Sequence, residues 1–326
     1  MKVLLVSPVF HGYWSAFASA LEALDLDVAV HCYDTAGRVG NALAHRYESS
    51  GVADRVRGTA TAATIAALAD ADPDAVLVVK GDFLGADWWD ALAASRARSA
   101  LWLYDELSRM TYDDATLGSV GRVFSYSPDD TRTLRARGLD ADVLPDGFDS
   151  LTAFTPRPSE RVSFVGSRYP ARARLLHVLA DAGEPVEAYG REWSRNPWDV
   201  LRTRQWRSAG VPAHRDIDRS TYYGVMAGSV ATLNIHGDGH DGLSMRTYEA
   251  PGVGALQLVD RPDVAQHYDV GTETLVFRSD DELVELVRRA RRDPVWASGI
   301  REAGRRRTLA EHTLVHRMRK VRAAWA

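Results

Sequence analysis

Apolar strands alternate with amphipathic helices along both halves of the chain, and this alternation restricts the fold more than any other feature. In the first half, "KVLLVS" (residues 2–7) predicts a buried strand, and "YWSAFASALEAL" (13–24) has the apolar spacing of a helix. The alternation restarts with "RVSFVG" (161–166), "PARARLLHVLADAG" (170–183) and "PVEAYG" (185–190). Such strands are typical of parallel sheets covered on both faces. We therefore predict two doubly wound α/β domains, with ligands bound in a crevice at the carboxyl ends of the strands.

A segment rich in proline, aspartate and serine separates the two halves. It runs from residue 144 to 161, "LPDGFDSLTAFTPRPSER". A length of 326 residues suits two domains better than one. We predict a first domain at 1–150, a linker at 151–160 and a second domain at 161–305.

Charge and composition exclude several classes of protein. Hydrophobic residues make up 45% of the chain and charged residues 26%, as in ordinary globular proteins, and the net charge of −4 argues against a general nucleic-acid binder. Residues 288–326 contain twelve Arg or Lys against three acids. We interpret this basic tail as a solvated helical face, with a patch for a membrane surface or a polyanionic acceptor as the alternative. No apolar run approaches the roughly 20 residues that span a bilayer.

The cysteine count and the first residues indicate a cellular compartment. The chain has one cysteine, Cys32, which excludes an intramolecular disulfide and a cysteine-based metal site. The start, "MKVLLVSPVF", predicts a strand, and no small-residue cleavage pattern follows it. We expect a cytoplasmic protein.

The stretch "GDGHDGLSMRTYEAPGVGALQLVD" (237–260), between a predicted strand and a predicted helix, contains several charged residues and several glycines. Backbone N–H groups at a helix that begins near Ser244 suit a phosphate group. Glu249 follows about one turn into that helix, where its carboxylate can accept hydrogen bonds from two neighbouring hydroxyls, as a ribose supplies. An ordinary surface role for Glu249 is the alternative, but Asp241 and Arg246 beside it favour a ligand site.

Two other strand ends carry candidate ligand-binding residues. In "FVGSRYPAR" (164–172), Gly166 permits a tight turn, and Arg168 could neutralise a diphosphate where other nucleotide enzymes use a metal. An ion pair with a surface acid is the alternative for Arg168. In "SPVFHGYW" (7–14), His11 and Gly12 follow the first strand and are expected to face the same crevice.

These motifs resemble a known family when they are taken in order. Residues 161–322 are similar to the C-terminal domain of the CgeB-type spore-maturation glycosyltransferase-like proteins, which are relatives of family 4 glycosyltransferases. The resemblance rests on "SFVGSRYPAR", "YYGVMAGSVATLNIHG", "RTYEAPGVGALQLVD", "FRSDDELVELV" and "AEHTLVHRMRKV". It implies a GT-B fold, in which two Rossmann-like domains face a central cleft and the second holds a nucleotide sugar. It also implies that a terminal helix, 306–326, packs back on the first domain.

The resemblance also implies roles for single residues. Asp241 and Glu249 match the family's Glu-x7-Glu motif, with Asp in place of the first Glu, so that Glu249 would bind the ribose hydroxyls and Asp241 the donor sugar. Arg168 matches the basic residue that stabilises the departing phosphate. Arg246 and Tyr248 match the family's Arg-x-Phe-Glu, with Tyr in place of Phe. The donor site is expected to comprise Gly12, Gly166, Gly190, Asp241, Gly242, Leu243, Ser244, Arg246, Tyr248 and Glu249.

The likeness to family 4 favours retention of the anomeric configuration, without a metal or a cofactor. The donor would be a UDP-, GDP- or dTDP-sugar, and a side-chain base, if one is used, would come from the first domain. Asp105 in "LWLYDELSR" and His11 are the candidates, with a turn residue and a loop histidine as the alternatives. His236 and His240 with Asp238 and Asp241 would suit a metal, but their glycine-rich turn lacks cysteine, and we predict none.

Aromatic residues are the last candidates for ligand contacts. Trp193, Trp198 and Trp206 can stack on a base or sugar, or else serve as core or lid. Near the first domain's crevice we expect Tyr13, Trp14, Trp88 and Trp89.

The leading hypothesis is a glycosyltransferase acting on an unidentified acceptor, which can be a glycan, a natural product, a protein or modified DNA. The alternatives are a nucleotide-sugar epimerase or hydrolase, and a non-catalytic binding or structural protein with a degenerate GT-B fold. A degenerate protein should have lost Arg168 or Glu249, and the chain retains both. The sequence makes no prediction of the oligomeric state.

Overall fold

A computed structural model describes residues 1–35, 51–236 and 241–326 as two compact units. The first unit comprises Met1–Leu151 and Leu314–Ala326, and the second Thr152–Thr313. Each unit contains a six-stranded sheet whose strand pairs are all parallel. The predicted pair of parallel α/β domains is therefore confirmed.

The first unit has the strand order β2-β1-β3-β4-β5-β6. Its strands are β1 (Lys2–Ser7), β2 (Asp27–Cys32), β3 (Ala75–Val79), β4 (Arg98–Trp102), β5 (Arg122–Ser125) and β6 (Ala141–Val143). The helices of its described residues are η1 (Phe10–Gly12), α1 (Tyr13–Glu22), α3 (Gly51–Ala71), α4 (Ala86–Ala94), η2 (Leu107–Arg109), α5 (Asp114–Gly118), α6 (Pro128–Ala136) and α13 (Leu314–Ala323).

The second unit has the strand order β12-β11-β10-β7-β8-β9. Its strands are β7 (Val162–Val165), β8 (Val186–Tyr189), β9 (Ala213–His214), β10 (Ala231–Asn234), β11 (Gln257–Val259) and β12 (Leu275–Val276). The helices of its described residues are α7 (Pro170–Asp181), α8 (Pro197–Thr203), α9 (Arg219–Gly228), α10 (Arg246–Gly252), η3 (Pro262–Gln266), α11 (Asp280–Arg292) and α12 (Pro294–Glu311).

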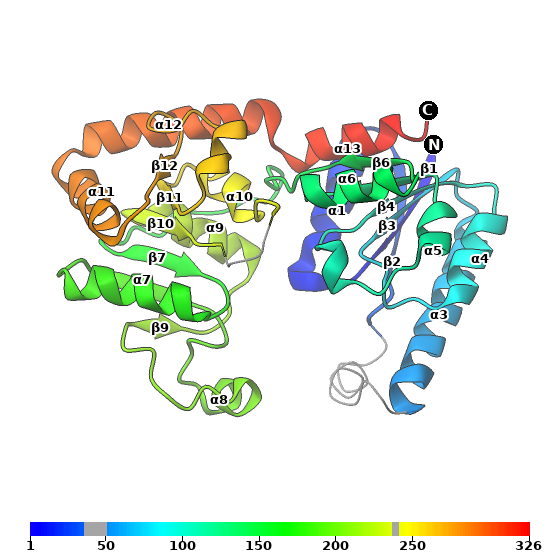
Figure 1. Cartoon of the computed structure of the whole chain (residues 1–326), viewed down its shortest axis with the longest axis horizontal. Helices are drawn as coiled ribbons and strands as arrows, with labels where there is room; N and C mark the ends of the chain where they lie inside the picture. Colours follow the sequence, from blue (N-terminus) through cyan, green and yellow to red (C-terminus); the bar gives the residue numbers. More distant parts are fainter. Residues whose placement is uncertain (36–50, 237–240) are drawn as a thin grey trace. The chain divides into compact units, whose positions relative to one another are not determined.

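The strand orders fix where a ligand can bind in each unit. In the first sheet the chain passes from β1 to β2 on one side and continues with β3 on the other, so the order reverses between β1 and β3. In the second sheet the order reverses between β7 and β10. Parallel sheets bind ligands beside such a reversal, at the carboxyl ends of the strands (Figure 1).

The core explains why the strands read as continuous apolar runs. Every residue of β3 is buried, and the core of the first unit also takes in Trp88 and Trp89, which are 0% and 5% exposed. These two tryptophans belong to α4 and fill the sheet's helical cover. They are core residues, and Trp89 also packs beside Gly81 in the turn after β3.

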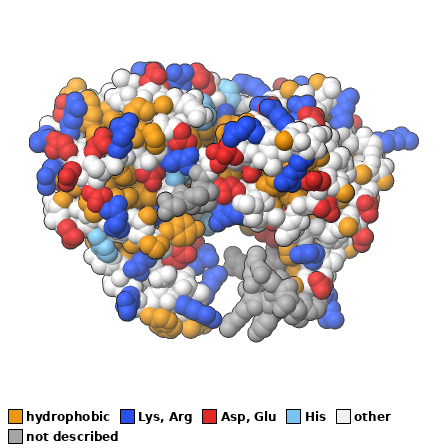
Figure 2. Space-filling view, in the orientation of Figure 1, with side chains coloured by type: hydrophobic (Ala, Val, Ile, Leu, Met, Phe, Trp, Pro, Cys, Tyr) orange, Lys and Arg blue, Asp and Glu red, His pale blue; other side chains and the backbone are white. Residues whose placement is uncertain are grey.

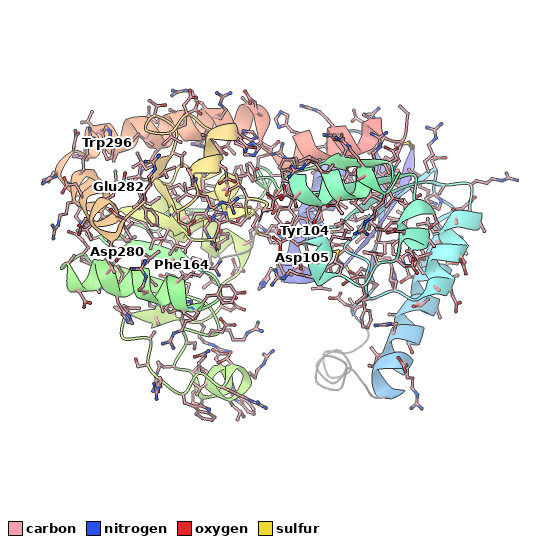
Figure 3. All side chains as sticks on the ribbon, viewed as in Figure 1. Tyr104, Asp105, Phe164, Asp280, Glu282 and Trp296 are labelled. Carbon is pink, nitrogen blue, oxygen red and sulfur yellow. The ribbon has the colours of Figure 1, made fainter. Side chains whose placement is uncertain are left out.

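Serine side chains cap the starts of two helices. The Ser127 hydroxyl accepts a hydrogen bond from the Asp130 N–H at 3.0 Å and caps α6. Ser279 caps α11 in the same way through the Glu282 N–H at 3.2 Å. The Glu282 carboxylate accepts a bond from the Arg278 N–H at 2.7 Å, one residue before the position expected in a capping box (Figure 3 labels Glu282).

The C-terminal helices differ from their predicted bounds. In place of one helix at 306–326, α12 extends to Glu311 and α13 begins at Leu314. The break falls at His312, whose ring is buried against Tyr248 and Tyr268. α13 belongs to the first unit, where Arg317 Nε donates to the Pro145 carbonyl at 2.9 Å.

Arginines of the basic tail pair with acids of their own unit. Arg291 Nε lies 2.8 Å from Glu184, and Arg307 Nε lies 3.2 Å from Glu273. These pairs fit the interpretation of the tail as a solvated, ion-paired helical face. Across the part of the chain that the structure describes, no helix combines the length and the apolar character needed to cross a bilayer.

Candidate functional site

Two glycines shape the strand ends beside the reversal in the second unit. Gly166 follows β7 with φ +145°, and an added Cβ would lie 2.9 Å from Arg246 Nη2. Gly190 follows β8 with φ +146°, and its Cβ would lie 2.7 Å from the Gly166 carbonyl oxygen. No other residue fits at either position without movement of its neighbours. The tight turn that the sequence predicts at Gly166 is present, and it allows an arginine to approach the strand end.

Arg172 is one of two cations at this strand end. Its guanidinium carbon lies 5.4 Å from the centre of the Phe164 ring, which Figure 3 labels on β7. Nε donates to the Ile235 carbonyl at 3.0 Å, and Nη1 donates to the Ser167 carbonyl at 3.2 Å. Burial and the neighbouring Arg246 charge lower the pKa of Arg172 to about 10. The surroundings therefore disfavour its positive charge.

Arg246, the first residue of α10, is the second cation. Its guanidinium carbon lies 5.2 Å from the same Phe164 ring. Nη2 donates to the Val165 carbonyl, and Nη1 lies 3.5 Å from the Asn234 amide oxygen. Nε is buried and has no hydrogen-bond partner among the described residues.

Together, Arg172 and Arg246 form an arginine pair whose repulsion the charges of Asp260 and Glu192 offset only in part. Within the described residues, neither side chain forms an ion pair with a carboxylate. Two partly buried like charges raise the free energy of the folded protein unless an anion neutralises them. A diphosphate offers several oxygens to such planar donors, and its charge would offset the repulsion. The pair can thus bind a diphosphate and stabilise it as a leaving group.

Arg168 has a different environment and contacts the Trp193 ring, which neighbours the Phe164 ring of the arginine pair. Its Nη1 and Nη2 donate to the carbonyls of Arg207 and Ser208 at 3.0 and 3.1 Å, and its guanidinium lies 5.7 Å from the Trp193 ring. The side chain thus ties the segment after α8 to the end of β7. Sequence reasoning selected Arg168 and missed Arg172, although both belong to "FVGSRYPAR" and only Arg172 sits in the first turn of α7.

Glu249 is fully buried, with both carboxylate oxygens engaged. Oε2 accepts a hydrogen bond from the Tyr222 hydroxyl at 2.9 Å, and Oε1 accepts one from Tyr223 at 3.2 Å. Burial, and next the Glu249 charge, raise the pKa of Tyr222 well above its ordinary value, while Arg246 opposes this shift. The carboxylate does bind a pair of hydroxyls, as predicted, but they come from α9 in this structure. No sequence pattern assigned that helix, so the tyrosines were missed.

A histidine holds the backbone in front of α10. The Ser244 N–H donates to His236 Nε2 at 3.1 Å, so the ring proton lies on Nδ1, which is 3.0 Å from Asp260 Oδ1. Burial lowers the pKa of His236, which favours this neutral form. The Ser244 hydroxyl donates to the Asn234 amide oxygen at 3.1 Å. These bonds hold Ser244 beside Asn234, whose amide oxygen Arg246 Nη1 also approaches.

The other predicted donor-site residues of the second unit have varied positions. Tyr248 is 1% exposed and packs against the rings of His267, Tyr268 and His312, which places it in the core instead of beside the arginine pair. Gly242 and Leu243 are buried, and the Asp241 carbonyl accepts a bond from Arg261 at 2.8 Å.

Asp238 and His240, named in the metal alternative, lie outside the described residues. Among the residues that the structure does describe, no group of three or more His, Cys, Asp or Glu side chains is arranged to hold a metal ion. Metal independence stays a prediction.

In the first unit, three strand ends carry strained residues. His11 follows β1, Lys80 follows β3 and Tyr104 follows β4, with φ of 46°, 63° and 57°. These three strands are neighbours in the sheet, and β1 and β3 flank the reversal of strand order. Left-handed backbone at residues other than glycine is costly and concentrates at functional sites. This edge is the candidate ligand site of the first unit.

The Asp105 carboxylate forms ion pairs with two neighbouring cations. Oδ2 lies 3.0 Å from Lys80 Nζ, Oδ1 lies 3.3 Å from Arg109 Nη1, and Oδ1 also accepts the Glu106 N–H at 3.0 Å. Figure 3 labels Asp105 beside Tyr104. These three contacts hold the Asp105 side chain in place at the edge of the sheet. The other candidate base, His11, is exposed, with its ring 5.0 Å from that of Phe10, and Gly12 begins α1 with φ +75°.

Asp82 is a titratable group that sequence reasoning passed over. Burial raises the pKa of its carboxyl, Lys80 and Arg57 oppose the shift, and Asp105 adds to it. Asp82 belongs to the turn after β3, directly beside the reversal of strand order. The polar tripeptide "GDF" after a buried strand was the available signal.

Comparison with known proteins bears on both units. Residues 168–323 match a family described as glycosyl transferase-like. No curated protein sequence matches the chain. Among solved structures, sucrose-phosphate synthase from Thermosynechococcus elongatus is 14% identical with a TM-score of 0.68, covering 99% of this chain and 98% of that one.

Two further structures were solved with nucleotide sugars bound. HepE from Anabaena, in complex with UDP-glucose, is 13% identical with a TM-score of 0.63, over 99% of this chain and 98% of that one. UDP-GlcNAc 2-epimerase from Neisseria meningitidis, bound to UDP-GlcNAc, is 12% identical with a TM-score of 0.59, over 99% of each chain. This chain has the GT-B fold. The GT-B prediction is confirmed, and residues 168–323 are similar to the glycosyl transferase-like family, whereas the narrower CgeB-type resemblance stays a prediction.

Proposed function

We propose that this GT-B protein is a glycosyltransferase that moves a sugar from a nucleoside diphosphate to an acceptor. The observation that carries the proposal is the arginine pair, Arg172 and Arg246, at the strand reversal of the second unit, where no described carboxylate forms an ion pair with either guanidinium. The glycosyl transferase-like match includes both arginines. The complexes of HepE with UDP-glucose and of the epimerase with UDP-GlcNAc support a UDP-, GDP- or dTDP-sugar donor.

In the proposed reaction, the bond between the sugar's anomeric carbon and the phosphate oxygen breaks. Negative charge then grows on the departing diphosphate, while the acceptor oxygen bonds to the anomeric carbon. Arg172 and Arg246 donate to the phosphate oxygens, and each such preorganised donor accelerates a reaction by roughly 10²–10³-fold. Two fixed cations take the role of a metal. The configuration is retained, and the departing phosphate takes the acceptor's proton, so no side-chain base is required.

The donor's ribose is the proposed partner of Glu249. Its two hydroxyls would replace those of Tyr222 and Tyr223 on the carboxylate, so binding requires Tyr222 to move away from Oε2. The proposed contacts of the sugar and diphosphate are Asp241 and the amides of Gly242, Leu243 and Ser244. His236 contributes by fixing the Ser244 amide.

The first unit is the proposed acceptor-binding unit. The strained residues at its strand ends and the carboxyl group of Asp82 supply hydrogen-bonding groups for an acceptor hydroxyl. Since Asp105 is paired with Lys80 and Arg109, we assign it to holding this edge together and not to proton transfer.

A thermal-shift screen with UDP, GDP, dTDP and ADP tests the donor proposal. One of the diphosphates should raise the melting temperature of the intact chain, since a ligand at 100 times its Kd stabilises a fold by about 2.7 kcal/mol. The corresponding nucleotide sugars, incubated without an acceptor, should stay unchanged. A new epimer or free sugar in that incubation would favour the epimerase or hydrolase, and no shift with any of the diphosphates would contradict the proposal.

A further inference from the structure

Three large apolar side chains are exposed on one part of the second unit. Trp198 is 71% exposed, Trp206 66% and Leu201 58%. They belong to residues 191–208, here named the tryptophan lobe, which consists of α8 and its flanking segments. In Figure 1, α8 lies beyond the edge strand β9, away from α11 and α12. Large exposed apolar groups that gather in one segment mark an interaction site.

The helix in this lobe, α8, is amphipathic, but it exposes its apolar side chains and buries its acidic one. Trp198 and Leu201 are three residues apart and therefore share a face of α8. Asp199, between them in sequence, is 3% exposed and turns inward. A helix on the surface of a water-soluble domain normally buries its apolar face and exposes its acids. This helix holds its apolar face outward and its acid inward.

Hydrogen bonds hold the exposed side chains in place. Arg215 donates to both carboxylate oxygens of Asp199, at 2.8 and 3.2 Å, and this lowers the pKa of the Asp199 carboxyl. Arg195 Nη1 donates to the Trp206 carbonyl at 3.3 Å, and Arg168 holds the two carbonyls that follow. The exposure of the tryptophans is thus a built feature of the lobe.

The lobe is also basic, although the chain as a whole has a net charge of −4. Residues 191–208 contain five arginines and two acids. Arg202, Arg204 and Arg207 are exposed, and none of them forms an ion pair with another described residue. Figure 2 shows apolar side chains at the outer end of this lobe, with Lys or Arg side chains on either side of them.

We propose that the tryptophan lobe docks the protein on a membrane surface that contains anionic lipids. Indole rings favour the boundary between headgroups and acyl chains, where Trp198 and Trp206 would sit with Leu201 on the apolar side. The three arginines would contact lipid phosphates, each adding roughly 1 kcal/mol of attraction to an anionic surface. A soluble glycan would match the indole rings but leaves Leu201 and the arginines without partners. The proposal is independent of the transfer reaction.

Vesicle co-sedimentation with the full chain tests the proposal. The vesicles contain phosphatidylcholine alone, or phosphatidylcholine with roughly 30 mol % phosphatidylglycerol. We expect binding to the anionic vesicles that weakens as salt rises, because surface charges are screened. The double variant Trp198→Ser/Trp206→Ser should bind at least about tenfold more weakly. The matched control is Val295→Ser on α12, which removes an 82% exposed apolar side chain elsewhere and should leave binding unchanged.

Depth of insertion supplies a second readout. Lipids brominated on their acyl chains should quench part of the tryptophan fluorescence of the wild type and much less of that of the double variant. Arg202→Gln/Arg204→Gln/Arg207→Gln should reduce binding to anionic vesicles and abolish most of its salt dependence. The proposal is wrong if the wild type fails to bind anionic vesicles at low salt, or if the double variant binds as well as the wild type. Fluorescence changes with soluble oligosaccharides in place of vesicles would also overturn it.

Discussion

The two units share an architecture and differ in what they place at the same point of it. Each sheet has six parallel strands, and in each the strand order reverses beside the first strand. At the reversal of the second unit, glycines with φ near +146° leave room for two arginines on one aromatic ring. At the reversal of the first unit, the left-handed residues His11, Lys80 and Tyr104 carry side chains, and two carboxyls and further aromatic rings lie on the same strand ends.

This difference indicates that the fold determines where a ligand binds, whereas the side chains at that position determine which ligand charge is favoured. We propose the arginine pair of the second unit as a site for an anion, because the Arg246 charge disfavours the Arg172 cation. The first unit holds Asp82 and Asp105 beside Lys80, so its edge gives no comparable net attraction for a diphosphate. Four sets of variants can break or sharpen this contrast.

The largest expected effect concerns the arginine pair. Arg172→Gln and Arg246→Gln should each lower kcat/KM for transfer by roughly 10²–10³-fold, because each removes a fixed donor from the departing diphosphate. Arg168→Gln is the matched control from the same sequence motif. Since it contacts only carbonyls and a ring, it should change transfer by less than about threefold while loosening the tryptophan lobe. Steady-state kinetics that show the reverse ranking would restore Arg168 to the site.

Glu249 and its tyrosines give the next largest effect. Glu249→Ala should lower the free energy of unfolding by about 1–3 kcal/mol, because it leaves two tyrosyl hydroxyls without their partner. A loss of binding by this variant therefore cannot be assigned to the ribose alone. Tyr222→Phe separates the two roles, since it releases Oε2 of the carboxylate. Calorimetry should show tighter diphosphate binding in Tyr222→Phe, by roughly tenfold for one hydrogen bond to a charged group. Equal or weaker binding would argue that Glu249 serves only to hold α9 and α10 together.

Variants of the carboxyls in the first unit are expected to have a smaller effect on kcat. Under retention the departing phosphate takes the proton, so Asp82→Asn should lower kcat by less than about tenfold. Asp105→Asn should act mainly on stability, by about 1 kcal/mol, since it weakens half-exposed bonds to Lys80 and Arg109. A loss of 10²–10⁴-fold in Asp82→Asn, together with a product of inverted configuration by NMR, would identify Asp82 as a general base.

The smallest effect is a pH-dependent change in stability. Because the pKa of Asp82 is raised in the folded protein, its ionised form destabilises the fold above that pKa, and this cost disappears below the unfolded value of about 3.9. Asp82→Asn should therefore be more stable than the wild type at pH 7, and the advantage should vanish as the pH approaches roughly 3. Urea titrations at several pH values measure this difference. A variant that is less stable at pH 7 would show that the carboxylate has a favourable partner.

Much of the fold followed from local sequence, because strand burial and helix caps are local properties. The continuous apolar run of β3, the caps at Ser127 and Ser279 and the turn at Gly166 are examples. The GT-B fold was predicted from the order of the motifs in residues 161–322, which is information over half of the chain. The burial of the two tryptophans of α4 did not follow from the sequence, because an exposed and a buried tryptophan give the same letter.

The site was predicted only in part, because its contacts are distant in sequence. Arg172 and Arg246 meet on the ring of Phe164, and nothing in "RYPAR" distinguishes Arg172 from Arg168. The carbonyls that hold Arg168 lie about forty residues further along the chain. Tyr222, the partner of Glu249, belongs to a tract whose tryptophans and arginines obscure any helical period.

A crystal structure with the diphosphate that gives the largest thermal shift tests the central claim most directly. We predict both phosphate groups at the reversal between β7 and β10, with phosphate oxygens within hydrogen-bonding distance of the guanidinium nitrogens of Arg172 and Arg246. Diphosphate density at Arg168 or at the strand ends of the first unit, with the arginine pair left without an anion, would contradict the account.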